Sequence, residues 1–70
     1  VQTEMGAAAG VRETIAALAG VVSAEDVTGP YDIIARVEAP GMDELGRDLL
    51  SAIQQISGIT RTLTCPVVRL

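Results

Sequence analysis

Two short stretches of this chain, residues 15–21 (IAALAGV) and residues 53–59 (IQQISGI), share one pattern. In each, two aliphatic residues three positions apart are followed by a glycine and then by a β-branched residue. Aliphatic residues at this spacing lie on one face of a helix. Glycine is common just past a helix C-terminus, and β-branched residues favour strands. Each stretch therefore predicts a helix that ends at a glycine and leads directly into a strand.

Upstream of each glycine, the apolar residues extend the helical pattern. A first helix is predicted over residues 7–19, with its apolar face formed by Ala8, Val11, Ile15 and Leu18. A second is predicted over residues 42–56, with a stripe formed by Met42, Leu45, Leu49, Ile53 and Ile56. Both helices are amphipathic, so each is expected to cover another element.

The remaining segments favour strands, at residues 1–5, 21–28, 31–39 and 59–70. Gly29 and Pro30 predict a tight turn between the second and third strands, and Pro66 indicates an edge or a bulge in the last. The order β-α-β-β-α-β predicts an α+β fold of the ferredoxin-like type. In it, both helices cover one face of a four-stranded antiparallel sheet, and the other face stays open.

The chain is small and apolar, with 70 residues of which 49% are hydrophobic. This length predicts a single domain over residues 1–70, which buries only ~60% of its unfolded surface. One cysteine excludes an internal disulfide, and the lack of histidine leaves no ligand set for structural zinc. Stability must then come from partners. We expect a homodimer formed by stacking the open sheet faces of two copies.

Composition also argues against several classes of partner. The net charge is −4, and Tyr31 is the sole aromatic residue, so direct nucleic-acid binding is not expected. Apolar stretches are much shorter than the ~20 residues that a membrane-spanning helix needs, which predicts no membrane partner. Sparse cysteine and the absence of a visible export signal favour the cytoplasm.

No catalytic set is evident, so we expect a protein that is not an enzyme and has neither a metal site nor a cofactor. Nucleophilic pairs usually need a histidine or lysine base, and the chain has neither. Glu25 and Asp26 point to opposite sides of a strand, while Asp43 and Glu44 suit a solvated helix start. Cys65 is interpreted as a small core residue.

One motif, Thr28-Gly29-Pro30-Tyr31-Asp32, leaves two interpretations open. In the first, it is a hairpin turn with a packing tyrosine and a capping aspartate. In the second, it forms a small-ligand site in which turn amides hold a carboxylate and Asp32 holds an ammonium group. The second interpretation suits an amino acid.

Three stretches carry a family resemblance: residues 17–22 (ALAGVV), 27–34 (VTGPYDII) and 56–64 (ISGITRTLT). Together they resemble the regulation-of-amino-acid-metabolism (RAM) domain, the effector-binding part of the leucine-responsive and asparagine-responsive (Lrp/AsnC) regulators. Ser57 stands where the family commonly has proline. The resemblance implies a ferredoxin-like fold, dimerisation by sheet stacking, and assembly of dimers, commonly into octamers.

It also implies that an amino acid or related metabolite binds in clefts between dimers. By position, the implied ligand-binding residues are Thr28, Gly29, Tyr31, Asp32, Thr62, Thr64, Cys65 and Pro66.

Full-length members carry an N-terminal helix-turn-helix, and this sequence shows none, so it is either a fragment of a longer chain or a stand-alone RAM protein, of which we favour the second. Its expected function is to sense an amino acid, in transcription regulation or amino-acid metabolism. Two alternatives stay open: a structural partner that co-assembles with full-length Lrp/AsnC regulators, and an enzyme of the dimeric α/β-barrel type that shares this fold.

Overall fold

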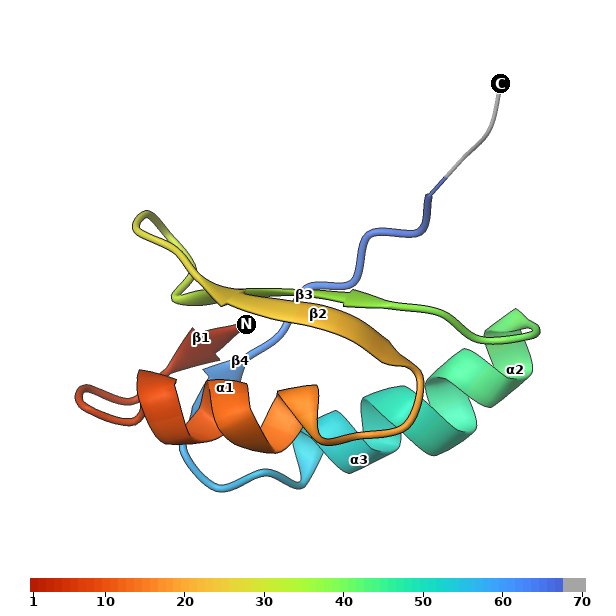
Figure 1. Ribbon diagram of the computed structural model, residues 1–70, viewed down its shortest axis with the longest axis horizontal. Coiled ribbons are helices and arrows are strands. Elements are labelled where there is room, and N and C mark those ends of the chain that lie inside the picture. The colour runs from red at the N-terminus through yellow and green to blue at the C-terminus, as the bar shows by residue number, and fades with distance from the viewer. Residues whose placement is uncertain (68–70) are drawn as a thin grey trace.

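The structure, a computed structural model, describes residues 1–67 and confirms the predicted order of elements (Figure 1). The strands are β1 (Gln2–Thr3), β2 (Val21–Asp26), β3 (Ile33–Val37) and β4 (Ile59–Arg61). The first helix is α1 (Ala8–Ala16). The second is continuous and has three parts: α2 (Met42–Glu44), the π-helical η1 (Leu45–Leu50) and α3 (Ser51–Gln54). Both helices lie on the same side of the strands, as in a ferredoxin-like α+β fold.

The strands form two antiparallel pairs, β1 with β4 and β2 with β3. Val1 joins the pairs. Its amino group donates to the Ile33 carbonyl at 2.8 Å, and the Ile33 N–H donates back to the Val1 carbonyl at 3.1 Å. The resulting order across the molecule is β4-β1-β3-β2. The predicted four-stranded sheet is therefore divided into two pairs, and the main chain joins them where Val1 bonds Ile33 and accepts the Asp32 N–H at 3.0 Å.

Next to the main-chain hydrogen bonds of Val1, the Asp32 side chain forms the further contact with β1. The Thr3 N–H donates to Oδ2 of Asp32 at 2.8 Å, and the Thr3 hydroxyl donates to the same oxygen at 3.3 Å. The pairing of β1 with β4 also shifts register between Gln2 and Thr3. Asp32 thus binds β1 with a carboxylate instead of a backbone carbonyl.

The core lies between α1 and the strands. Val11 and Ile15 of α1 pack with Ile33 of β3, and the last two side chains are fully buried. Burying one such side chain stabilises a fold by about 1.5–3 kcal/mol. Leu49 and Ile53 are the buried residues of the second helix. These are the helical faces that the sequence periodicity predicted.

Gly20 and Gly58 have positive φ angles of 91° and 99°, as their place after the helices predicted. In this region glycine avoids the strain that a Cβ causes. Both positions are also crowded. A Cβ at Gly20 would lie 3.1 Å from the Glu38 carbonyl oxygen, and one at Gly58 would lie 3.1 Å from the Ala7 Cβ.

Every element is shorter than the sequence predicted, two of the element ends differ by three or more residues, and strand pairing explains the larger of these two differences. The last strand was predicted over residues 59–70 but ends at Arg61, because its partner β1 has only two residues. Residues 62–67 belong to no helix or strand, and residues 68–70 lie outside the described part. Leu63 in this segment is 62% exposed. The first helix ends at Ala16 rather than at residue 19, and a turn leads from there to Gly20.

In the predicted apolar stripe of the second helix, Leu49 and Ile53 are buried, but Met42 is 64% exposed. The π-helical η1 lies between Met42 and the buried residues. Its wider turns rotate the preceding residues away from the face that a regular 3.6-residue period predicts. Within residues 1–67, no helix is long and apolar enough to cross a membrane.

Replacing Gly58 with alanine should lower the free energy of unfolding by about 1–3 kcal/mol, through left-handed strain and contact with Ala7 and Val11. Gly46 is the matched control. It is helical, and a Cβ added there would meet open space, so Gly46→Ala should raise stability by up to ~1 kcal/mol. Urea unfolding followed by circular dichroism at fixed protein concentration measures both. Equal effects would contradict this account of Gly58.

Asp32→Ala should destabilise the fold by about 1 kcal/mol, because it leaves the half-buried Thr3 N–H without its acceptor. Asp26→Ala is the control on the same hairpin. It removes only an exposed ion pair with Arg12, at 3.0 Å, which typically contributes ~0–1 kcal/mol. Amide hydrogen exchange should also speed up at Thr3 in Asp32→Ala and stay unchanged in the control. Unaltered exchange at Thr3 would show that Asp32 does not hold β1.

Candidate functional site

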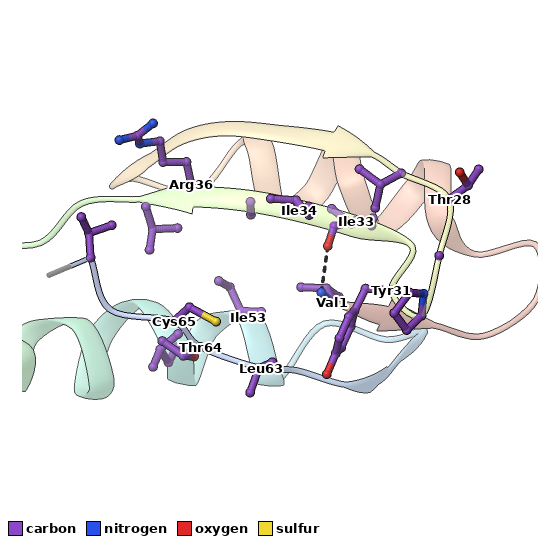
Figure 2. Close-up of a pocket in the computed structure, with 17 residues that line it drawn as sticks. Val1, Thr28, Tyr31, Ile33, Ile34, Arg36, Ile53, Leu63, Thr64 and Cys65 are labelled. Carbon is purple, nitrogen blue, oxygen red and sulfur yellow. Dashed lines mark hydrogen bonds between the residues drawn. The ribbon is translucent and has the colours of Figure 1, made fainter.

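A cavity of about 840 Å³ opens beside β3 (Figure 2). One wall is β3, and the loop between β2 and β3 forms one end. Leu50 and Ile53 of the second helix line the floor, and the chain beyond β4 forms the remaining wall from Leu63 to Val67. The volume is within the ~300–1,000 Å³ typical of small-ligand sites. The cavity therefore lies between the two segments that the resemblance implicated.

The loop at the end of the cavity is a hairpin closed by a hydrogen bond from the Val27 N–H to the Asp32 carbonyl, at 2.9 Å. Gly29 has a φ of 144°, a conformation that side-chain-bearing residues rarely adopt. Pro30 then restricts the backbone before the half-buried Tyr31. This local geometry turns the Tyr31 ring to the cavity, where Figure 2 shows it below Val1.

Five of the eight predicted ligand-binding residues line this cavity. They are Thr28, Gly29, Tyr31, Thr64 and Cys65.

The other three, Asp32, Thr62 and Pro66, are not among its lining residues. The Asp32 carboxylate is engaged by Thr3 instead, so the structure uses it to hold β1. Cys65 is exposed, and its interpretation as a small core residue is wrong. The cause is the early end of β4, which leaves the chain after Arg61 without a covering strand.

Several lining residues were not predicted from the sequence. Most are apolar side chains of β3 and the second helix, but one is charged: Arg36. Successive residues of β3 point to opposite faces, and the alternating sequence of this strand could have shown that Arg36 lies on the exposed face, opposite to the buried Ile33. An arginine beside a hairpin motif that suits a carboxylate could have been singled out on that ground.

The charged residue at the cavity is Arg36. Among the lining residues within the described part of the chain, Arg36 is positively charged and none is acidic. Figure 2 shows the exposed Arg36 side chain on the side of β3 away from Thr64 and Cys65. Val1 also borders the cavity, and burial lowers the pKa of its amino group, while the nearby negative charge of Asp32 acts in the opposite direction. The arrangement can hold a small molecule through a carboxylate and apolar contacts, and no cluster of metal-ligating side chains occurs in the described region.

Comparison with known proteins gives a family. The family model of the Lrp/AsnC ligand-binding domain matches residues 1–70. Uncharacterized HTH-type transcriptional regulators of Pyrococcus horikoshii and Pyrococcus furiosus are each 33% identical over 54 residues. A third, from Pyrococcus abyssi, is 32% identical over 54 residues.

Each match covers 77% of this chain and 36% of the relative, so the aligned part is about a third of those regulators. No solved structure matches significantly. The family model, the element order and the paired glycine turns agree, and the chain belongs to the Lrp/AsnC family of ligand-binding domains.

Proposed function

We propose that this domain is a non-catalytic effector-binding and oligomerisation module that senses an amino acid or a related metabolite. The regulatory character of the family and of the relatives' names supports a role in transcription regulation or amino-acid metabolism, in the cytoplasm. We assign the ligand to five residues that line the cavity and to three of their chain neighbours. The five are Thr28, Gly29, Tyr31, Thr64 and Cys65, and the neighbours are Asp32, Thr62 and Pro66.

The observation that carries this proposal is the composition of the cavity. A carboxylate would approach the amides of the hairpin that begins at Thr28, and the exposed Arg36 side chain would turn from its position in Figure 2 to pair with it, because charge-assisted hydrogen bonds are the strong ones. The walls from Ile34, Ile53 and Leu63 are apolar and suit an aliphatic or aromatic side chain. A small amphipathic carboxylate matches both parts.

Two copies are proposed to stack through the face of the strands that the helices leave uncovered. Val22 and Ile34 are exposed on the strand pair β2–β3, at 56% and 60%. Large exposed aliphatic residues on a sheet favour burial against a partner. Stacking would give a homodimer, and dimers would assemble further into an octamer or a similar oligomer with ligand clefts between them.

The relatives support a second candidate, in which this domain co-assembles with full-length Lrp/AsnC regulators. They are named HTH-type transcriptional regulators, and the part that aligns with this chain is about a third of their length. A shared domain would let the two chains form mixed oligomers. Affinity purification of this chain from its source cell would then recover a regulator with a DNA-binding part.

Isothermal titration calorimetry against the twenty amino acids and their 2-oxo acids tests the effector role. At least one should bind with a millimolar or tighter Kd. Arg36→Gln should weaken binding by roughly 10- to 150-fold, because a hydrogen bond to a charged group contributes ~1.5–3 kcal/mol. Arg47→Gln is the matched control, since Arg47 is exposed on the second helix and outside the cavity.

Two outcomes would count against the proposal. In the first, none of these ligands binds at millimolar concentration. In the second, a ligand binds but Arg36→Gln and Arg47→Gln weaken it equally, which would place the site away from the cavity.

A further inference from the structure

Asp32 uses only one of its two carboxylate oxygens in its contact with β1. The Thr3 N–H and the Thr3 hydroxyl both donate to Oδ2, at 2.8 Å and 3.3 Å. Among residues 1–67 no hydrogen bond reaches the other oxygen, Oδ1. No side-chain oxygen in this part of the chain is both buried and without a partner, so Oδ1 of the half-buried Asp32 is open to solvent. An ionised carboxylate can accept about four hydrogen bonds, so Oδ1 keeps its capacity to bind.

The negative charge of Asp32 has no ion-pair partner in the described part of the chain. The ion pairs found there join Arg12 to Asp26, at 3.0 Å, and Arg47 to Asp48, at 3.2 Å. A cation that reached Oδ1 would therefore meet a carboxylate whose charge no arginine of residues 1–67 offsets. Hydrogen bonds between charged groups are about twice as strong as those between neutral ones, so this oxygen favours a charged donor.

Asp32 lies at the border of the cavity. Its chain neighbours Tyr31 and Ile33 both line the cavity, and so does Val1, whose carbonyl accepts the Asp32 N–H at 3.0 Å (Figure 2). Burial lowers the pKa of the Val1 amino group, and the negative charge of Asp32 acts against this effect. The field of the carboxylate therefore reaches an ammonium group at the edge of the cavity.

The turn that precedes Asp32 places a second ligand-binding element beside it. Asp32 closes this hairpin, since its carbonyl accepts the Val27 N–H at 2.9 Å. A ligand carboxylate would approach the amides of the same turn, from Thr28 onwards. An α-amino acid carries its ammonium and carboxylate groups on one carbon atom, so the elements that hold them must lie close together. A single tight turn meets this requirement.

We propose that Thr3 is a positioning residue: by holding Oδ2 of Asp32, it directs Oδ1 to the ammonium group of a ligand in the cavity. This inference rests on the proposed function, because it concerns the same ligand site. Asp32 then has two roles at once, since one oxygen holds β1 and the other binds the ligand. A binding side chain works best when neighbouring hydrogen bonds fix its orientation. Thr3 does not touch the ligand, so its effect should be confined to ligands that carry an ammonium group.

Calorimetry with matched ligand pairs tests this on the full chain. Leucine, valine and phenylalanine serve as probes, each beside the 2-oxo acid of the same side chain, which has a carbonyl in place of the ammonium group. The amino acids should bind about tenfold more tightly or better, because only they can donate to Oδ1. Equal binding of the two classes would overturn the inference and leave the proposed effector site standing. If neither class binds at millimolar concentration, that effector site fails and the inference fails with it.

Variants of Thr3 separate positioning from a purely structural role. Thr3→Val removes the hydroxyl and should weaken amino-acid binding by about fivefold, the effect of one ordinary hydrogen bond, while the 2-oxo acids bind as before. Thr3→Ser keeps the hydroxyl and should bind both classes as the unaltered domain does. Thr60→Val is the matched control, because the Thr60 hydroxyl donates to the Gln2 carbonyl at 3.2 Å and ties β4 to β1. An equal loss for both classes in Thr3→Val, or no loss in either, would contradict the positioning role.

Hydrogen exchange at the Thr3 amide shows whether Oδ2 stays with Thr3 when a ligand binds. With an amino acid bound, this amide should exchange no faster than in the free domain. The Glu4 amide, which donates to the Gly58 carbonyl at 2.8 Å, is the internal reference. Faster exchange at Thr3 alone would mean that the ammonium group displaces Thr3, against the inference. Asp32→Asn keeps an acceptor for Thr3 but loses the charge, so it should remove the preference for amino acids while the Thr3 amide stays protected.

Discussion

The sheet of this domain depends on a junction of a few hydrogen bonds at its centre. Val1 exchanges two backbone hydrogen bonds with Ile33, the Asp32 N–H donates to the Val1 carbonyl at 3.0 Å, and the Asp32 carboxylate accepts two more hydrogen bonds from Thr3. Ile33, fully buried against α1, anchors this junction in the core, so the hydrophobic contact and the hydrogen bonds stabilise the same point of the chain.

The cavity lies beside this junction, between β3 and the chain after β4. Its lining combines the turn at Gly29 with apolar side chains of β3 and the second helix, and Arg36 borders it.

Local chemistry explains which features could be predicted from sequence. The glycines at positions 20 and 58, the buried Ile15 and the element order follow from residue spacing and backbone preference, and the structure confirms them. The early end of β4 depends on the length of its distant partner β1, which no pattern within residues 59–70 contains. The π-helical η1 likewise interrupts a periodicity that looks regular in sequence.

For the site, the hairpin motif and the segment after β4 were predicted from resemblance, and five of those residues share one cavity. Arg36 as a lining residue and the structural role of Asp32 could be found only from the fold, because both depend on which residues the strands place side by side.

The most direct test of the central claim, that this domain binds a small carboxylate in the cavity, is an NMR titration of the ¹⁵N-labelled domain with amino acids and 2-oxo acids. We expect the amide signals of Gly29, Tyr31, Arg36 and Cys65 to shift together and saturably. Shifts confined to other parts of the domain, or none at millimolar ligand, would contradict it.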